Sequence, residues 1–167
     1  MDQVINIQAM SLDDVAKVVE IYSKVYNSAY VSFGELAAGL ADSSGFPTEN
    51  AVELFREEVV SLVTSSDEGQ FVATIDGCVA GFALASLEDT VAGHIECWLS
   101  DMGVLPDYQG RKIGRKLVEK VIEWGCQENA KYFLLESGLD NEQAHRFFEG
   151  AGFHPLAIVF HRVASPS

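Results

Sequence analysis

The stretch VLPDYQGRKIGRKLVEKV, residues 104–121, restricts the fold of this chain more than any other segment. A β-rich run over residues 94–105 leads into it, two glycines interrupt the turn, and apolar residues at helical spacing follow. This order predicts a strand, a turn and an amphipathic helix over residues 110–130. Five of the eleven Lys and Arg residues lie at the start of that helix: Arg111, Lys112, Arg115, Lys116 and Lys120.

The position of these cations predicts a site for an anion. A helix N-terminus presents unpaired backbone N–H groups and the positive end of the helix dipole, so cations are unfavourable there unless an anion is bound. The alternative is a solvated helix face on which glutamates pair with the cations. The stretch does not match G-x-x-x-x-G-K-[ST], and no G-x-G-x-x-G follows the first predicted strand. These mismatches disfavour a nucleoside triphosphatase and a dinucleotide-linked dehydrogenase.

The overall charge narrows the class of ligand further. The chain carries 25 acidic and 11 basic residues, a formal net charge of −14. A potential of that sign repels phosphates, which disfavours general binding of nucleic acids or anionic membranes. Cationic small molecules would be attracted, although acidity that only keeps the protein soluble explains the composition equally well. The three cysteines are widely spaced and no paired histidines accompany them, so neither a disulfide framework nor a metal site is expected.

The rest of the chain predicts a single α/β domain with a mixed sheet over residues 1–167. A hairpin is expected over residues 70–87, because two β-rich runs flank Asp76-Gly77. The other expected elements are a strand at 4–9, a helix at 11–26 with Ser11 as N-cap, a helix at 49–64, a strand at 132–137, a helix at 141–151 ended by Gly152, and two terminal strands at 153–159 and 160–163. With no leader-like or membrane-spanning run, a soluble cytoplasmic protein is expected.

At these motifs the sequence resembles the GNAT superfamily of N-acetyltransferases. The turn QGRKIG, residues 109–114, is similar to the family pattern [Q/R]-x-x-G-x-[G/A], except that Lys112 stands where glycine is usual. Downstream, the family pattern N-x-x-A-x-x-hydrophobic-aromatic-x-x-x-G-F is matched by Asn141, Ala144, Phe147, Phe148, Gly152 and Phe153. The likeness covers about residues 69–163. Within the superfamily, the sequence looks most like aminoglycoside 6′-N-acetyltransferases and related enzymes that act on small amines.

The resemblance implies an α/β fold with splayed central strands and flanking helices, and acetyl-CoA as cofactor. The pantetheine arm would fill the gap beside Met102, Gly103 and Val104, and the pyrophosphate would rest on the turn and helix start. If position 112 has a right-handed helical φ, which any residue can adopt, a lysine there in place of the usual glycine is tolerated. The residues implied to bind the cofactor are Met102, Gly103, Val104, Gln109, Gly110, Arg111, Lys112, Ile113, Gly114, Arg115, Asn141 and Phe148.

The implied reaction is acetyl transfer to a primary amine by direct attack on the thioester. An amine is mostly protonated at neutral pH, so a base must accept its proton. Asp101 is the first candidate, followed by Glu136 and Glu96, and the Val104 amide is expected to stabilise the oxyanion. Many relatives place a tyrosine acid where this chain has Phe148. His145 is one replacement donor, although a structural histidine is an open alternative.

Two other functions remain open from the sequence. Phe148 and the uncertain base are also compatible with a catalytically weak domain that binds or senses acyl-CoA. A polyphosphate- or RNA-binding module using the basic helix is disfavoured by the net charge. The acceptor is expected to be a small, cationic amine, with Tyr22, Tyr26, Tyr30, Phe33 and Trp98 as candidates for its wall. An apolar C-terminal strand could pair across a two-fold axis in a homodimer.

Overall fold

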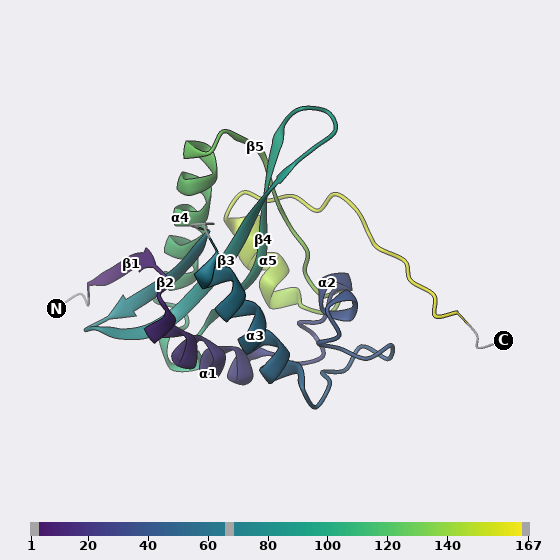
Figure 1. Cartoon of the computed structure of the whole chain (residues 1–167), viewed down its shortest axis with the longest axis horizontal. Helices are drawn as coiled ribbons and strands as arrows, with labels where there is room; N and C mark the ends of the chain where they lie inside the picture. The colour runs from purple at the N-terminus through teal and green to yellow at the C-terminus, as the bar shows by residue number, and fades with distance from the viewer. Residues whose placement is uncertain (1–3, 66–68, 165–167) are drawn as a thin grey trace.

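The computed structural model describes residues 4–65 and 69–164, and its centre is one five-stranded sheet (Figure 1). The strands lie side by side in chain order, and every neighbouring pair is antiparallel except β4 and β5, which are parallel. Their bounds are β1 Ile5–Ala9, β2 Gln70–Ile75, β3 Cys78–Asp89, β4 Ile95–Val104 and β5 Ala130–Leu135. The mixed α/β sheet predicted from the sequence is confirmed.

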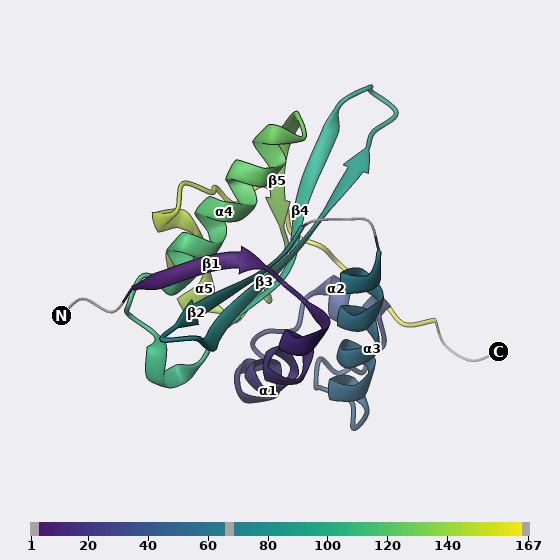
Figure 2. The same cartoon turned by 60° about the vertical axis from the view of Figure 1, so that its left-hand side comes forward.

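Helices cover both faces of this sheet (Figure 2). On one face α1 and α3 pack against Phe82 and Leu84 of β3, and on the other α4 packs against Ala83 and Ala85 of the same strand. Because side chains alternate along a strand, β3 supplies both layers of the core. The helices are α1 Val15–Val25, α2 Phe33–Ala37, α3 Ala51–Thr64, α4 Ile113–Gln127 and α5 Glu142–Gly150, with short 3-10 helices Leu12–Asp14 (η1) and Pro106–Tyr108 (η2).

The β2–β3 hairpin forms at the predicted dipeptide. Ile75 pairs with Cys78, which leaves Asp76 and Gly77 as the two loop residues. Both have positive φ, 51° and 80°, as the favoured two-residue hairpin turn requires. Such a turn matches the right-handed twist of the strands that it joins.

Two expectations about secondary structure were wrong or incomplete. Residues 153–164 form no strand in the described chain, and the large apolar side chains from Leu156 onward are exposed. A β-prone segment forms a strand only where an edge is available to pair with it, and this segment runs away from its own sheet (Figure 1). The short helix α2 was missed; it begins at a capping box in which the Glu35 carboxylate accepts hydrogen bonds from the Ser32 backbone and hydroxyl.

None of the helices among the described residues is both long and apolar enough to cross a membrane.

Candidate active site

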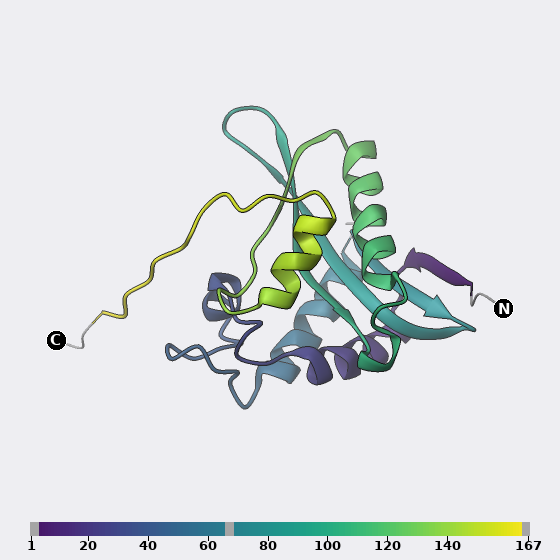
Figure 3. The same ribbon diagram turned by 180° about the vertical axis from the view of Figure 1, so that it is seen from behind.

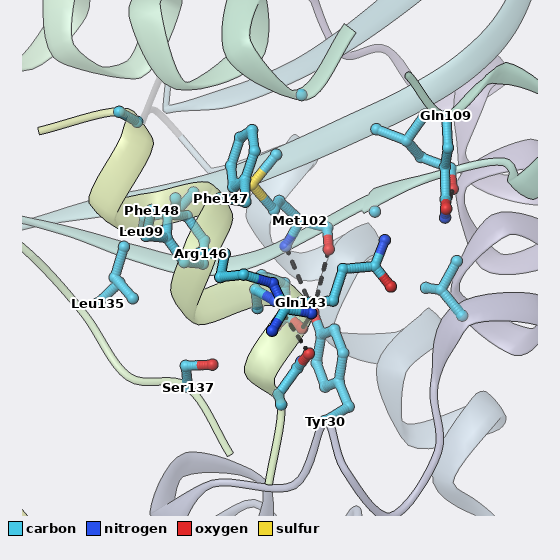
Figure 4. A pocket seen from close by; sticks show the side chains of 18 of the residues that line it. Tyr30, Leu99, Met102, Gln109, Leu135, Ser137, Gln143, Arg146, Phe147 and Phe148 are labelled. Atoms are coloured by element: carbon cyan, nitrogen blue, oxygen red, sulfur yellow. Dashed lines mark hydrogen bonds between the residues drawn. The ribbon is translucent and has the colours of Figure 1, made fainter. Parts of the chain in front are cut away.

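β5 pairs with only the first half of β4. Their last partners are Leu99 and Leu135, and beyond that point no strand of the described chain pairs with this edge of β4. β5 ends there and the chain turns toward α5. A cleft of about 840 Å³ opens between the second half of β4, the segment that follows β5, the start of α4 and α5, and Figure 4 shows side chains that line it.

A β-bulge at Ser100 determines which side chains reach the cleft. Ala85 pairs with Leu99 and Leu84 with Asp101, so Ser100 is the extra residue on β4. Without the bulge, Leu99 and Asp101 would lie on the same face of the sheet. With it, Leu99 packs in the core under α4, whereas Asp101 lies opposite Leu84, which packs in the core under α1 and α3.

The free edge of β4 presents backbone polar groups to the cleft. The Leu105 amide donates a hydrogen bond to the Ala80 carbonyl of β3. Because backbone N–H and C=O groups point to alternate sides along an antiparallel strand, those of Met102 and Val104 point away from β3, toward the cleft. The Tyr30 hydroxyl lies 3.2 Å from the Met102 carbonyl oxygen and 3.4 Å from its amide nitrogen (Figure 4). The Gln109 side-chain amide donates to the Val104 carbonyl at 3.3 Å.

Asp101 is a buried carboxyl group in this cleft. It is 6% exposed, and its Oδ1 accepts a hydrogen bond from the Tyr30 hydroxyl at 2.9 Å. Burial raises the pKa of Asp101 well above its usual value, the charge of Glu35 raises it further, and the Tyr30 hydrogen bond opposes both. Burial also raises the pKa of Tyr30 far above its usual value, so this phenol keeps its proton and donates. The pair is thus a protonatable group coupled to a proton donor inside the cleft.

Two more carboxylates line the same cleft near α2. Glu35 is 6% exposed and caps α2, and Glu136 accepts hydrogen bonds from the Gly34 amide at 3.1 Å and the Ser32 hydroxyl at 3.3 Å. Glu136 therefore ties the end of β5 to the start of α2. Glu96, the third candidate base, does not line the cleft; it lies near His94 and the Trp98 indole nitrogen instead.

The opposite end of the cleft is the turn into α4. The first intrahelical hydrogen bond runs from the Lys116 amide to the Lys112 carbonyl, so the amides of Ile113, Gly114 and Arg115 precede it. Lys112 has φ 66° and ψ 11°, which is the left-handed region. The expectation of a right-handed helical φ at Lys112 was wrong. A left-handed φ is the conformation that glycine adopts without cost, which explains why the family pattern has glycine there.

Some of the basic side chains at this turn form ion pairs and some line the cleft, and Arg115 does both. Arg115 Nε lies 3.4 Å from Glu119 Oε1, and Lys120 Nζ lies 2.9 Å from Glu123 Oε2. Part of the helix face is therefore a solvated surface on which glutamates pair with the cations, as the alternative to an anion site predicted. Lys112 and Arg115 also line the cleft. Arg111 does not: its guanidinium carbon lies 5.1 Å from the ring centroid of Tyr108.

The α5 wall of the cleft is capped and apolar. Asn141 caps α5 by accepting a hydrogen bond from the Ala144 amide at 3.2 Å. Phe148 lines the cleft and packs edge-on against Phe147, with ring centroids 5.1 Å apart. His145 lies 2.9 Å from the Gly138 carbonyl through Nε2, which must donate there, and it does not line the cleft. His145 is thus a structural histidine in this arrangement.

The cleft brings together most of the residues singled out from the sequence. Of the expected catalytic and cofactor residues, Arg111, Glu96 and His145 do not line it, whereas the others do: Asp101, Glu136, Met102, Gly103, Val104, Gln109, Gly110, Lys112, Ile113, Gly114, Arg115, Asn141 and Phe148. Among the five aromatic candidates only Tyr30 lines it, and Tyr22 is fully buried. Glu35 was missed, although the Ser32-x-x-Glu35 capping-box pattern could have indicated a helix start there.

Two substitutions of Lys112 separate the effect of its left-handed φ on stability from the effect of its charge on ligand binding. Lys112→Gly is expected to raise the free energy of unfolding by about 1 kcal/mol, because glycine adopts this φ without a Cβ clash. The same change removes an ammonium from the cleft and is expected to weaken binding of a polyphosphate ligand such as coenzyme A. Urea denaturation and calorimetric titration with coenzyme A measure the two effects.

Lys112→Ala is the matched control, since it removes the ammonium but keeps the Cβ. It should weaken coenzyme A binding as Lys112→Gly does, without the gain in stability. Equal stabilities for the two variants would show that the left-handed conformation carries no strain.

The geometry defines a class of protein: an α/β domain with a ligand cleft beside β4, where its parallel partner β5 ends, next to a basic helix N-terminus. The family model described as Acetyltransferase (GNAT) family matches residues 33–153. This match covers well over half of the chain, so the protein belongs to the GNAT acetyltransferase family.

Individual relatives agree with this assignment. The chain is 33% identical over 93 residues to an uncharacterized N-acetyltransferase of Archaeoglobus fulgidus, an alignment that covers 52% of this chain and 60% of that protein. It is 24% identical over 97 residues to aminoglycoside N(6′)-acetyltransferase type 1 of Salmonella typhimurium, covering 55% of this chain and 67% of the relative.

Among solved structures, the fold is similar to that of aminoglycoside N-acetyltransferase AAC(6′)-Iy in complex with CoA. The TM-score is 0.67 at 19% sequence identity, and the match covers 99% of this chain and 98% of the other. At this identity the likeness supports the fold.

Proposed function

We propose that the protein is an acetyl-CoA-dependent N-acetyltransferase that acts on a primary amine of a small, cationic acceptor. The observation that carries the proposal is the cleft itself: its α4 end presents unpaired amides and cations, and its α2 end presents the carboxyl groups of Glu35, Asp101 and Glu136. One ligand with a diphosphate and one with an ammonium group fit the two ends. The family membership supports this pairing of ligands.

The residues present fit coenzyme A at the α4 end. Amides of Ile113, Gly114 and Arg115 have no earlier helical carbonyl to bond, and the side chains of Lys112 and Arg115 add positive charge. The free edge of β4 offers backbone groups of Met102 and Val104 to an extended chain. Because Tyr30 and Gln109 now contact part of that edge, these two side chains would exchange partners when the site is filled.

The chain's own groups provide a route for the proton. Acetyl-CoA would supply an activated acyl group as a thioester. Asp101, whose raised pKa makes it a stronger base than an exposed aspartate, would accept the amine proton directly or through water. The Tyr30 hydroxyl orients the Asp101 carboxylate by its 2.9 Å hydrogen bond. The Val104 amide faces the cleft, where it would stabilise negative charge developing on the acyl oxygen.

Phe148 cannot donate a proton to the leaving thiolate. His145 cannot replace it in this arrangement, because its Nε2 donates to the Gly138 carbonyl. A thiol of pKa about 8.5 leaves readily as the thiolate, so water can complete the step. A moderate turnover rate follows from this arrangement.

A second function is favoured by the same observation. A cleft that binds acyl-CoA without a proton donor at Phe148 would also serve a catalytically weak acyl-CoA sensor. The two functions differ in one measurable property, namely whether free thiol is released steadily when an amine is added.

An amine panel with acetyl-CoA tests the proposal and its acceptor class. The panel should include polyamines, aminoglycosides, a peptide N-terminus and a neutral monoamine, with free thiol followed over time. Steady, acceptor-dependent release with the polycations is the expected result. Binding of acetyl-CoA with no such release would favour the sensor, and no binding of coenzyme A would overturn both functions.

Glu35→Gln refines the acceptor class. The substitution removes a negative charge from the cleft while keeping an oxygen that can accept the Ser32 hydrogen bonds. We expect KM for a polycationic acceptor to rise about tenfold and KM for a monoamine to change little, because the lost attraction scales with acceptor charge. Glu88→Gln, which removes a charge outside the cleft, should leave both constants unchanged. Equal changes in KM for both acceptors would contradict a role for Glu35 in charge recognition.

A further inference from the structure

Ser137, on the segment that joins β5 to α5, has a buried hydroxyl group without a hydrogen-bond partner among the described residues. Its Oγ atom has almost no exposed surface, and the residue lines the cleft. Figure 4 shows the hydroxyl turned from this segment toward the interior of the site. A buried donor that stays unpaired destabilises the folded chain, so an unpaired hydroxyl at a ligand cleft calls for an explanation, and a catalytic role is one.

The chain fixes Ser137 in place from both sides. Before it, the Glu136 carboxylate accepts a hydrogen bond from the Gly34 amide at 3.1 Å. After it, the Gly138 carbonyl accepts one from His145 Nε2 at 2.9 Å. Figure 3 shows the segment running beside α2 before it enters α5. A hydroxyl held between two such anchors is pre-organised for a ligand, and His145 acts as a support for it.

The place of Ser137 in the cleft indicates which part of a ligand it meets. β5 ends at Leu135, opposite Leu99, and Ser137 follows two positions later, where the free edge of β4 begins. That edge continues to Val104, and the turn into α4 lies beyond its other end. A ligand with its diphosphate at the α4 turn and its arm along the β4 edge therefore brings its far end to Ser137. In coenzyme A that far end carries the sulfur.

A hydrogen-bond donor beside the sulfur is the group that the site otherwise lacks. Phe148 has no proton to give, and His145 is bonded to the Gly138 carbonyl. A serine hydroxyl donates one hydrogen bond, and such a bond is stronger when the acceptor is an anion. The unpaired hydroxyl of Ser137 therefore suits an acceptor that becomes negative during the reaction.

We propose that Ser137 is a catalytic residue that donates a hydrogen bond to the sulfur of coenzyme A as the thioester breaks. The amine nitrogen bonds to the acetyl carbon, the carbon–sulfur bond breaks, and its electron pair leaves on sulfur as a thiolate. The amine proton passes to Asp101, and Ser137 keeps its own proton while it stabilises the thiolate. Water protonates the thiolate afterwards. This inference rests on the proposed function, because it needs coenzyme A in the cleft.

A cycle of two proteins and two ligands tests the contact without turnover. The wild type and Ser137→Ala are titrated calorimetrically with coenzyme A and with dethio-coenzyme A, in which hydrogen replaces the thiol, above a pH of about 8.5, where the free thiol is ionised. Ser137→Ala is expected to weaken binding of coenzyme A about tenfold and to leave binding of the sulfur-free ligand unchanged. Carboxylates of the cleft, such as Asp101 and Glu136, act on the sulfur in both proteins, so their effects cancel in the comparison.

Ser23→Ala is the matched control, since it is the same substitution outside the cleft. The Ser23 hydroxyl donates to the Glu20 carbonyl within α1, and its loss should leave the affinities for both ligands as in the wild type. Ser137→Ala should unfold at the wild-type temperature or above it, because it removes a buried donor that has no partner among the described residues. A loss of folded protein is therefore not the expected cause of weaker binding.

Kinetics with acetyl-CoA give a second readout. Ser137→Ala is expected to lower kcat about tenfold with little change in KM for acetyl-CoA, because the hydrogen bond strengthens only as negative charge develops on sulfur. Equal affinities of the wild type and Ser137→Ala for coenzyme A would overturn the role of Ser137 and leave the proposed function standing. An equal loss for both ligands would overturn it as well, since the hydroxyl would not act on the sulfur. A wild type that binds neither ligand would overturn the proposed function and this inference together.

Discussion

Asp101→Asn is expected to lower kcat/KM by about 10²–10⁴-fold near neutral pH, because it removes the group best placed to accept the amine proton. The asparagine oxygen can still accept the Tyr30 hydrogen bond, so the cleft should keep its shape. Initial rates across a pH series, with the acceptor found in the amine panel, measure the effect. In the wild type the rate should fall as Asp101 becomes protonated at low pH, and in the variant this limb should disappear.

Glu136→Gln is the control for Asp101→Asn, since it changes another carboxylate of the same cleft. Glu136 is exposed and bonds the start of α2, so its replacement should leave the pH limb in place. A pH–rate profile that Asp101→Asn does not alter would remove Asp101 from the mechanism.

The raised pKa of Asp101 also predicts a change in stability of the opposite sign. Its pKa is higher in the folded than in the unfolded chain, so its contribution to stability is complete below the unfolded pKa and is lost as the pH rises through the folded value. The free energy of unfolding should therefore be higher for Asp101→Asn than for the wild type at pH 8, with the difference shrinking toward about pH 4. Urea denaturation at the two pH values measures it. Less active but more stable is the combination expected of a functional buried acid.

Gly138→Ala is expected to lower the free energy of unfolding by about 2 to 3 kcal/mol. A Cβ at this position would lie 2.1 Å from the Ala29 carbonyl oxygen and 2.7 Å from that of Val31, so backbone atoms must move apart. The two carbonyls flank Tyr30, whose hydroxyl contacts Asp101 and Met102. The displacement should therefore also reduce activity, and thermal unfolding together with kcat/KM measures both losses.

Gly150→Ala is the matched control for Gly138→Ala. It lies in α5, and its added Cβ would meet no atom within 4 Å. Alanine favours a helix over glycine, so this variant should be more stable by about 0.5–1 kcal/mol. If Gly138→Ala proved as stable as Gly150→Ala, the close approach of the two loops would not be a constraint on the fold.

Local patterns were sufficient to predict most of the elements. The Asp76-Gly77 dipeptide specified its hairpin because few residues tolerate two successive positive φ angles. The apolar stripe after Gly110 specified α4, whose buried residues include Leu117 and Val121. The apolar pattern of residues 153–163 was misinterpreted for a physical reason, since β-propensity describes a segment and not the edge that it needs.

The amino-acid sequence alone determined the strand-turn-helix unit, its basic helix start and the α/β class, because propensity, turn chemistry and hydrophobic spacing act over a few residues. Only the tertiary structure decided how Asp101 is placed and which side chain bonds it. The bulge at Ser100 turns Asp101 away from the face of Leu99, and Tyr30 reaches it from 71 positions earlier in the chain. The left-handed φ of Lys112 was likewise decided by how the turn joins β4 to α4. Contacts between residues so far apart depend on the packing of whole elements, which local sequence patterns do not contain.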